Sequence, residues 1–288
     1  MKGYNYNRLL PYVLLLPTFI LVALVAAYPI IVSLIYSLSK MRYLKFERFV
    51  GLENYVRIMG DQGFWQSLSV SLKYYGLSIA IVIPLGLLLA TLLSSKVKFL
   101  TLFRTIIFLP WVLSQTITAL IWGWLLNENF GPILWIFSKF GNDNISFLSD
   151  VNNALPLVVL ANVWNSCPFA IIFLMSAIQS IPEELNEAAK IDGANTFQKF
   201  NKITLPLIMP TLSVVFIQLT LLYFNMVTLI FVMTGGGPLG STSTLSLYTF
   251  QHAFQFWNTS YAAALTFLLL VINLLFAGLY VRLFRVQY

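Results

Sequence analysis

The side chains that most often carry catalysis are scarce in this sequence. His252 is the single histidine and Cys167 the single cysteine, so neither has a second residue of its kind to share a metal ion. A serine-based triad also fails, because no carboxylate lies near His252 in the sequence. The glycines at 235–237 are not followed by the Gly-Lys pair of a phosphate-binding loop. We therefore expect neither an enzyme nor a bound cofactor or metal in this chain.

A second group of residues suits binding rather than catalysis. Amide, hydroxyl and aromatic side chains interrupt otherwise apolar stretches at Asn162, Trp164, Asn165, Gln218, Tyr223, Asn225 and Thr228. Such groups match a sugar, because amides can bond its hydroxyls and aromatic rings can pack on its C–H faces. The alternative is that they join neighbouring helices, which hydrogen bonds inside a membrane commonly do. We also expect Pro168 to kink the helix that carries the first three of them.

One polar segment, residues 181–206, has the pattern of helix, tight turn and helix. Pro182 suits the first turn of a helix, and the carboxylates that follow it complement the helix dipole. Gly193 is expected to end this helix, because glycine readily adopts a positive φ. A second short helix is predicted from about Thr196. The apolar side of the first helix consists of Leu185, Ala188, Ala189 and Ile191.

Composition decides which environment holds these residues. Of the 288 residues, 59% are hydrophobic and 9% are charged, whereas a soluble domain has roughly 45–50% apolar and about 25% charged residues. The net charge of +7 does not form one basic patch, since the basic residues lie between apolar blocks, so nucleic acid is not an expected partner. The chain is predicted to be an all-α membrane protein in contact with the lipid bilayer.

Uncharged runs long enough to cross a bilayer predict the membrane spans. We expect six helices, near 10–38, 68–94, 104–126, 155–180, 203–233 and 260–284. An even number places both termini on one side, expected to be the cytoplasm. The distribution of Lys and Arg favours this orientation only slightly, because the first outer loop is itself basic.

The polar segment resembles a known sequence motif. Glu187-Ala188-Ala189, Gly193 and Leu205-Pro206 are similar, in type and spacing, to the EAA motif of permease subunits of type I ABC importers. Further matches to the carbohydrate-uptake branch, the maltose-type and glycerol-3-phosphate-type importers, occur along most of the chain. They include residues 49–55, Phe108-Leu109-Pro110, Val163-Trp164 and the Thr-Gly-Gly-Gly-Pro run at 234–238.

The resemblance implies a fold and a set of partners. It implies six transmembrane helices of the type I importer permease fold, with residues 1–66 as first helix and outer loop and 67–284 as permease core. The segment 181–206 would be a cytoplasmic coupling helix that docks on an ATPase through Glu187, Ala188, Ala189, Asp192, Gly193 and Ala194. The implied partners are a second permease subunit, two ATP-binding subunits that bind ATP and Mg, and an extracytoplasmic solute-binding protein. The implied location is the cytoplasmic membrane of a bacterium or archaeon.

The expected activity is import of a sugar or oligosaccharide by alternating access. A permease for glycerol-3-phosphate or another polyol phosphate is the alternative, although it would need a basic contact that the spans do not supply. An ATP-independent carrier or channel is the alternative of another class, and it leaves the coupling segment without a role. Thr228 stands where the family usually has an aspartate, which weakens the inference of a substrate contact there.

Overall fold

The computed structural model describes residues 10–42, 45–94, 100–140 and 145–284. Residues 1–9, 43–44, 95–99, 141–144 and 285–288, which include both termini, lie outside the described residues. Contacts between residues divide the chain into two compact units, Met1–Asp61 with Thr249–Leu268 and Gln62–Tyr248 with Leu269–Tyr288. The predicted division into 1–66 and 67–284 separates regions by their expected roles and not by contacts between residues, and it stays a prediction.

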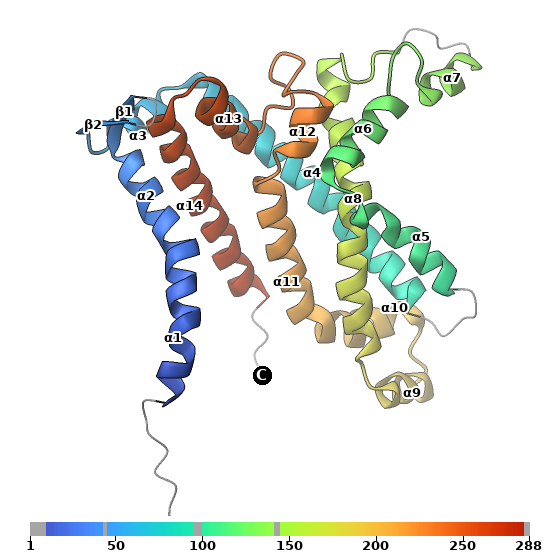
Figure 1. Cartoon of the computed structure of the whole chain (residues 1–288). Coiled ribbons are helices and arrows are strands. Elements are labelled where there is room, and N and C mark those ends of the chain that lie inside the picture. The colour runs from blue at the N-terminus through green and yellow to red at the C-terminus, as the bar shows by residue number, and fades with distance from the viewer. Residues whose placement is uncertain (1–9, 43–44, 95–99, 141–144, 285–288) are drawn as a thin grey trace, which may run out of the picture. The chain divides into compact units, whose positions relative to one another are not determined.

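The first unit begins with a long apolar helix, built from α1 (Leu10–Val22), the π-helical turn η1 (Ala23–Ala27) and α2 (Tyr28–Ser37). Its Pro11–Ser37 stretch is long and apolar enough to span a membrane, and its side chains are mostly exposed. Exposed apolar side chains over such a length suit a lipid environment. This helix corresponds to the span predicted near 10–38 (Figure 1).

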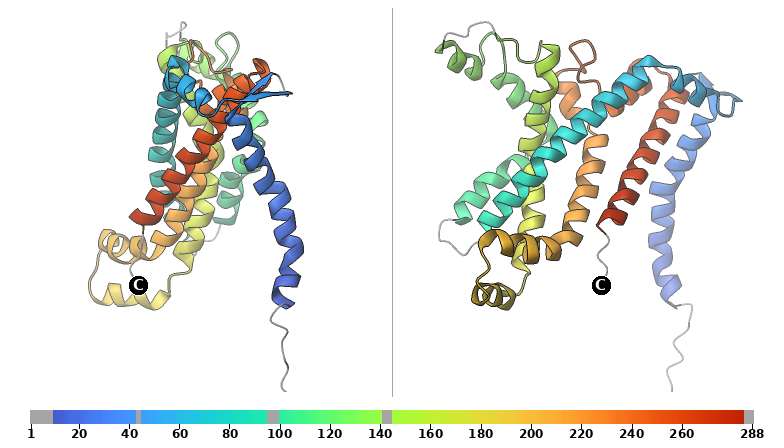
Figure 2. Two further views of the ribbon diagram at one scale, coloured as in Figure 1. Left: turned by 90° about the vertical axis from the view of Figure 1, so that its left-hand side faces the viewer. Right: turned by 180° about the vertical axis from the view of Figure 1, so that it is seen from behind.

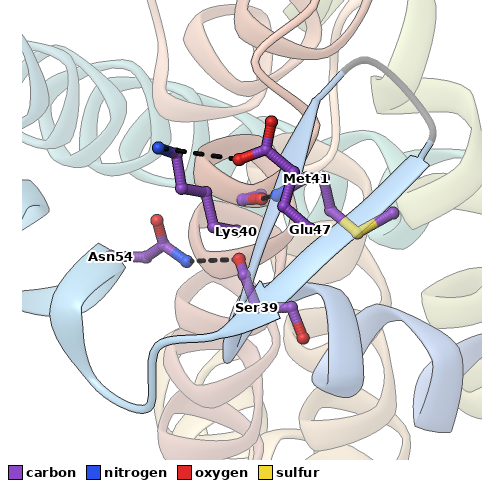
Figure 3. Close-up of polar contacts among 6 residues, drawn as sticks. Ser39, Lys40, Met41, Glu47 and Asn54 are labelled. Carbon is purple, nitrogen blue, oxygen red and sulfur yellow. Dashed lines mark hydrogen bonds and ion pairs between the residues drawn. The ribbon is translucent and has the colours of Figure 1, made fainter.

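A β-hairpin, which the prediction of an all-α fold did not include, follows this helix. β1 (Ser39–Arg42) pairs antiparallel with β2 (Lys45–Phe49), and Lys40 Nζ lies 3.6 Å from Glu47 Oε2 across the pair. Asn54 Nδ2 donates to the Ser39 carbonyl at 3.0 Å (Figure 3). Strand pairing satisfies backbone groups that a polar loop would otherwise leave to water. The hairpin is the only sheet among the described residues.

The first unit also contains a cluster of polar and aromatic side chains beside α3 (Glu53–Met59). Tyr261, in the first turns of α14 (Thr259–Leu283), donates a hydrogen bond to Asp61 Oδ2. The Arg57 guanidinium lies 5.1 Å from the Tyr261 ring centroid, and the His252 ring lies 4.7 Å from it. His252 belongs to the π-helical turn η3 (Gln251–Gln255). The cluster therefore joins α3, η3 and the start of α14.

The second unit contains most of the remaining helices. They are α4 (Gln62–Leu93), α5 (Leu100–Val112), α6 (Gln115–Leu125), α7 (Pro132–Ser138), α8 (Val151–Gln179), α9 (Glu183–Ile191), α10 (Thr196–Lys199), η2 (Phe200–Thr204), α11 (Leu205–Phe224) and α12 (Thr228–Met233), while α13 (Leu245–Phe250) begins in this unit and ends in the first. Its core is the pairing of α4 with α8. A Cβ atom on Gly86 would lie 3.1 Å from Ala170 Cβ, so small residues allow this close approach.

Two predicted spans differ from the observed helices. The third predicted span is broken between α5 and α6, whose axes differ by 100°. The fifth predicted span is also interrupted, because α11 ends at Phe224 and α12 begins at Thr228. α8 is helical from Val151 to Gln179 with Pro168 inside it, so the kink expected at this residue stays a prediction. Five described helices are long and apolar enough to cross a membrane, and the α5–α6 pair makes a sixth span when counted as one.

Candidate functional site

The EAA-like segment forms two short helices joined by a tight turn. α9 starts after Pro182, and its first turn carries Glu183 and Glu184, as the helix dipole favours. The turn closes because the Gly193 N–H donates to the Lys190 carbonyl and the Ala194 N–H donates to the Ala189 carbonyl. These bonds form a Schellman motif, which requires a positive φ at the residue after the cap. Gly193 has a φ of 73°, which confirms the predicted conformation.

The second helix of the segment is capped by its own side chains. The Asn195 side chain accepts from the Gln198 N–H at 2.8 Å, and the Gln198 side chain accepts from the Asn195 N–H at 2.9 Å. Such a reciprocal pair satisfies two N–H groups that the first turn leaves open. α10 then continues through η2 into α11, so the segment is attached directly to a membrane span. Both views place α9 and α10 at the end of α8 and α11 that is opposite to α12 (Figure 1, Figure 2).

The predicted coupling residues form an exposed surface. Four of them are exposed: Glu187, Ala188, Asp192 and Gly193. Ala194 is half-buried, and Ala189, in the last turn of α9, is buried. The apolar side chains here are largely uncovered, with Ile191 87% and Phe197 72% exposed. Glu187 also lines a cavity of about 590 Å³ between α9, η2 and the ends of α4 and α8. A carboxylate beside uncovered apolar groups on a rigid turn is suited to contact another protein.

The predicted pathway residues separate into three sets, of which the first joins helices. Asn162 Nδ2 donates to Ser78 Oγ at 3.2 Å, and Tyr223 Oη lies 2.8 Å from Ser166 Oγ. Asn162 is 0% and Tyr223 1% exposed. These bonds link α4, α8 and α11, so both residues act in helix packing in this structure, as the alternative interpretation proposed.

Asn165 explains why the third span is broken. Its Nδ2 lies 2.8 Å from the Pro110 carbonyl, 3.4 Å from the Leu113 carbonyl and 3.1 Å from Thr118 Oγ1. The Pro110 carbonyl already accepts from the Leu113 N–H at 3.2 Å, and Asn165 adds a second donor to it and a donor to the Leu113 carbonyl at the end of the helix. Ser114 caps the start of α6 by accepting from the Ile117 N–H at 3.3 Å. One amide on α8 thus stabilises a break in a neighbouring span.

The second set lines a groove beside this break. The groove has a volume of about 380 Å³ and includes Asn165 and Gln218 among the predicted residues. Its other polar walls are Ser114, Gln115 and Ser166, and its aromatic walls are Trp111 and Phe169, whose ring centroids lie 6.2 Å apart. No lining residue is charged. The prediction did not include Trp111 and Phe169, which line this groove; Pro110 followed by Ser114 is the sequence signal of a helix break that would have pointed to them.

The third set lies away from the groove. Trp164 packs against Trp122, with ring centroids 6.2 Å apart, and lines a separate apolar pocket with Cys167. Asn225 caps α11 by donating to the Leu221 carbonyl at 2.7 Å, and Thr228 begins α12. Asn225 and Thr228 are exposed at the end of the spans opposite to α9. The glycine run lies at that end too, where Gly235 and Gly236 have φ of 64° and 94°, so it forms the predicted turn.

The sequence and fold match those of characterised transport proteins. Residues 82–285 match the family described as "Binding-protein-dependent transport system inner membrane component". The trehalose/maltose transport system permease protein MalF of Thermococcus litoralis is 32% identical, covering 96% of this chain and 94% of that protein. The sn-glycerol-3-phosphate transport system permease protein UgpA of Yersinia enterocolitica is 31% identical, covering 96% and 93%. A chain of a bacterial ABC transporter that imports the acidic polysaccharide alginate superposes with a TM-score of 0.83 at 25% identity, covering 96% and 95%.

Proposed function

Because this chain belongs to the family of binding-protein-dependent transport system inner membrane components, we propose that it is the permease subunit of an ATP-driven importer for a sugar or oligosaccharide. The observation that carries the proposal is that the same spans form both features. The spans that line the uncharged, aromatic-walled groove also carry α9 and α10, which form the EAA-like turn. Transport proceeds by alternating access, in which the groove is open to one side of the membrane at a time.

The α9 surface is proposed to be the coupling element. Glu187 offers a carboxylate to a basic group of the ATPase, while Ala188 and the neighbouring Ile191 offer a contact without bulky polar groups. Asp192, Gly193 and Ala194 hold the turn that presents them. The ATPase binds ATP and Mg, and the permease itself needs no cofactor. This assignment places α9 and both termini in the cytoplasm, and α12 and the glycine turn on the outer side.

The groove is proposed to contact the solute. Gln115 and Gln218 offer amide donors and acceptors to hydroxyl groups, and Trp111 and Phe169 offer faces for C–H groups. A charged ligand would need an opposite charge in such a place, because burying an unpaired charge is costly. The uncharged walls therefore favour a neutral sugar over a polyol phosphate. A second permease subunit would complete the pathway, and a solute-binding protein would deliver the sugar.

The proposal is tested with the complete transporter in proteoliposomes, prepared with its partner permease, ATP-binding subunits and binding protein. We expect ATP-dependent uptake of a sugar that glycerol-3-phosphate does not compete with. Gln218→Ala is expected to reduce uptake while leaving assembly with the ATPase intact, and Asn225→Ala, at an exposed cap outside the groove, serves as the control. Uptake without ATP, or competition by glycerol-3-phosphate at sugar-like concentrations, would contradict the proposal.

A further inference from the structure

The segment between α6 and α8 exposes a set of large apolar side chains that the pathway and the coupling surface do not use. Phe130 is 69%, Trp135 60%, Ile136 51% and Phe140 80% exposed. Trp135 and Ile136 belong to the short helix α7, and Phe130 and Phe140 flank it. Burying a side chain of this size is worth roughly 1.5–3 kcal/mol relative to leaving it in water. A cluster of four in one loop therefore calls for something that covers it.

Hydrogen bonds and a ring contact among the described residues connect this cluster to the chain before α8. Glu128 Oε1 accepts from the Phe147 N–H at 2.8 Å and the Ser149 N–H at 3.1 Å, and Glu128 Oε2 accepts from Ser149 Oγ at 2.9 Å. The rings of Phe137 and Phe147 pack with centroids 6.1 Å apart. These contacts tie the end of α6 and α7 to the residues before α8. The exposed side of α7 thus has a defined position.

The position and chemistry of α7 indicate the lipid interface. Both figures place α7 beyond the end of α6, on the side away from α11 (Figure 1, Figure 2). α6 itself exposes Ile117, Leu120 and Trp124, which share one helix face. Apolar side chains are therefore exposed both on this membrane span and on the helix that lies beyond its end.

The charged residue that directly follows α7, Lys139, fits the same environment. Lys139 Nζ lies 3.8 Å from the centroid of the Trp135 ring. Tryptophan prefers the boundary between hydrocarbon and headgroups, and a lysine can keep its charge in the headgroups while its stem lies along apolar surface. A surface that bound a water-soluble protein would not need to continue the lipid-facing side of a span.

We propose that α7, with Phe130 and Phe140, is a membrane-interface anchor that inserts into the leaflet at the end of the spans opposite to α9. The occupant of this surface is lipid at the headgroup–acyl boundary. By holding α6 at the interface, the anchor also holds the α5–α6 break against α8. The inference depends on membrane insertion of the chain and not on the solute that it transports.

The test measures whether lipid or water reaches α7. Single cysteines replace Ile136 and Phe140 in a Cys167→Ala background and carry an environment-sensitive fluorophore, in the complete transporter in lipid nanodiscs. Nitroxide lipids, labelled near the headgroup, report lipid contact, and iodide reports water. Leu120 on α6 is the lipid-facing control, and Leu239, which is 88% exposed in the glycine turn, is the water-facing control. If one labelled variant does not fold, the other and a Phe130 cysteine keep the test valid.

We expect nitroxide lipids to quench emission at 136 and 140 as they do at Leu120, with little quenching by iodide and no change when the binding protein is added. Quenching by iodide alone would overturn the proposal. Protection that depends on the binding protein would assign the surface to that protein instead. Resistance to both quenchers would show that another subunit covers α7, and this too would overturn the anchor.

Discussion

Gly193 is the residue at which local conformation and the proposed coupling depend on each other most directly. Its φ of 73° closes the turn after α9, and apart from its two chain neighbours no described residue comes within 4 Å of the position that a Cβ would occupy. Within the chain, a larger side chain at this position is therefore disfavoured by the backbone conformation and not by lack of space. Any steric effect of a larger side chain would be felt by a partner.

We predict that Gly193→Val leaves the six spans inserted but abolishes ATP-dependent uptake. Strain at a positive φ costs on the order of 1–3 kcal/mol for such a residue. Gly193→Asn is the matched control, because asparagine tolerates this conformation better and should retain more uptake. Glu187→Ala should be milder than the valine variant, since one charged contact is lost without backbone distortion. Uptake at the wild-type rate by correctly inserted Gly193→Val would remove the coupling role from this turn.

Asn165 is the second residue whose role is open to a direct test. We predict that Asn165→Leu destabilises the protein by about 1–3 kcal/mol, because its amide hydrogen bonds to the Pro110 and Leu113 carbonyls and to Thr118 Oγ1 are lost together. Asn225→Leu removes the same side chain from an exposed helix cap and should cost less. Thermal unfolding of both variants in the same detergent measures the difference. Equal melting temperatures would mean that Asn165 does not stabilise the α5–α6 break.

At the scale of elements, the junction of α3, η3 and α14 depends on the charge of His252. Burial lowers the pKa of His252, the Asp61 carboxylate raises it and the Arg57 guanidinium lowers it, with a net value below the ordinary one. The neutral imidazole is thus favoured in the folded protein. Its contribution to stability is present above the ordinary pKa of about 6.5 and is lost as the pH falls through the lower folded pKa.

We predict that the wild-type protein loses more thermal stability than His252→Gln when the pH is lowered from about 7 to about 5. Glutamine keeps a polar side chain at this position but does not take up a proton. The measurement is the melting temperature of both proteins across this pH range. Parallel curves would contradict the role given to His252.

At the scale of the whole molecule, membrane orientation decides whether the coupling assignment is possible. We predict that a cysteine at Asn195 reacts with a membrane-impermeant thiol reagent only after cells are opened, once Cys167 has been replaced. A cysteine at Leu239 should react in intact cells, after removal of any outer membrane. Asp143, the outer position suggested by sequence alone, lies outside the described residues. The reverse labelling pattern would place α9 outside and exclude an ATPase contact.

Features with local causes were predictable from the sequence. The spans follow from long uncharged runs, and the turn after α9 follows from a glycine placed behind a helix-forming stretch. The start of α10 follows in the same way, because Asn195 and Gln198 cap it from three residues apart. In each case the deciding interactions lie within a few residues, so the order of residues contains the information.

Features that depend on distant partners were decided by the tertiary structure. The third span breaks where Asn165 can reach the Pro110 carbonyl, and these residues are 55 positions apart. The same packing separates Gln218, which faces the groove, from Tyr223, which is buried against Ser166, although both are polar residues of α11. Polarity alone places such side chains away from lipid but does not say whether they meet a cavity or another helix. That choice depends on which helix faces pack together, a property of the assembled bundle.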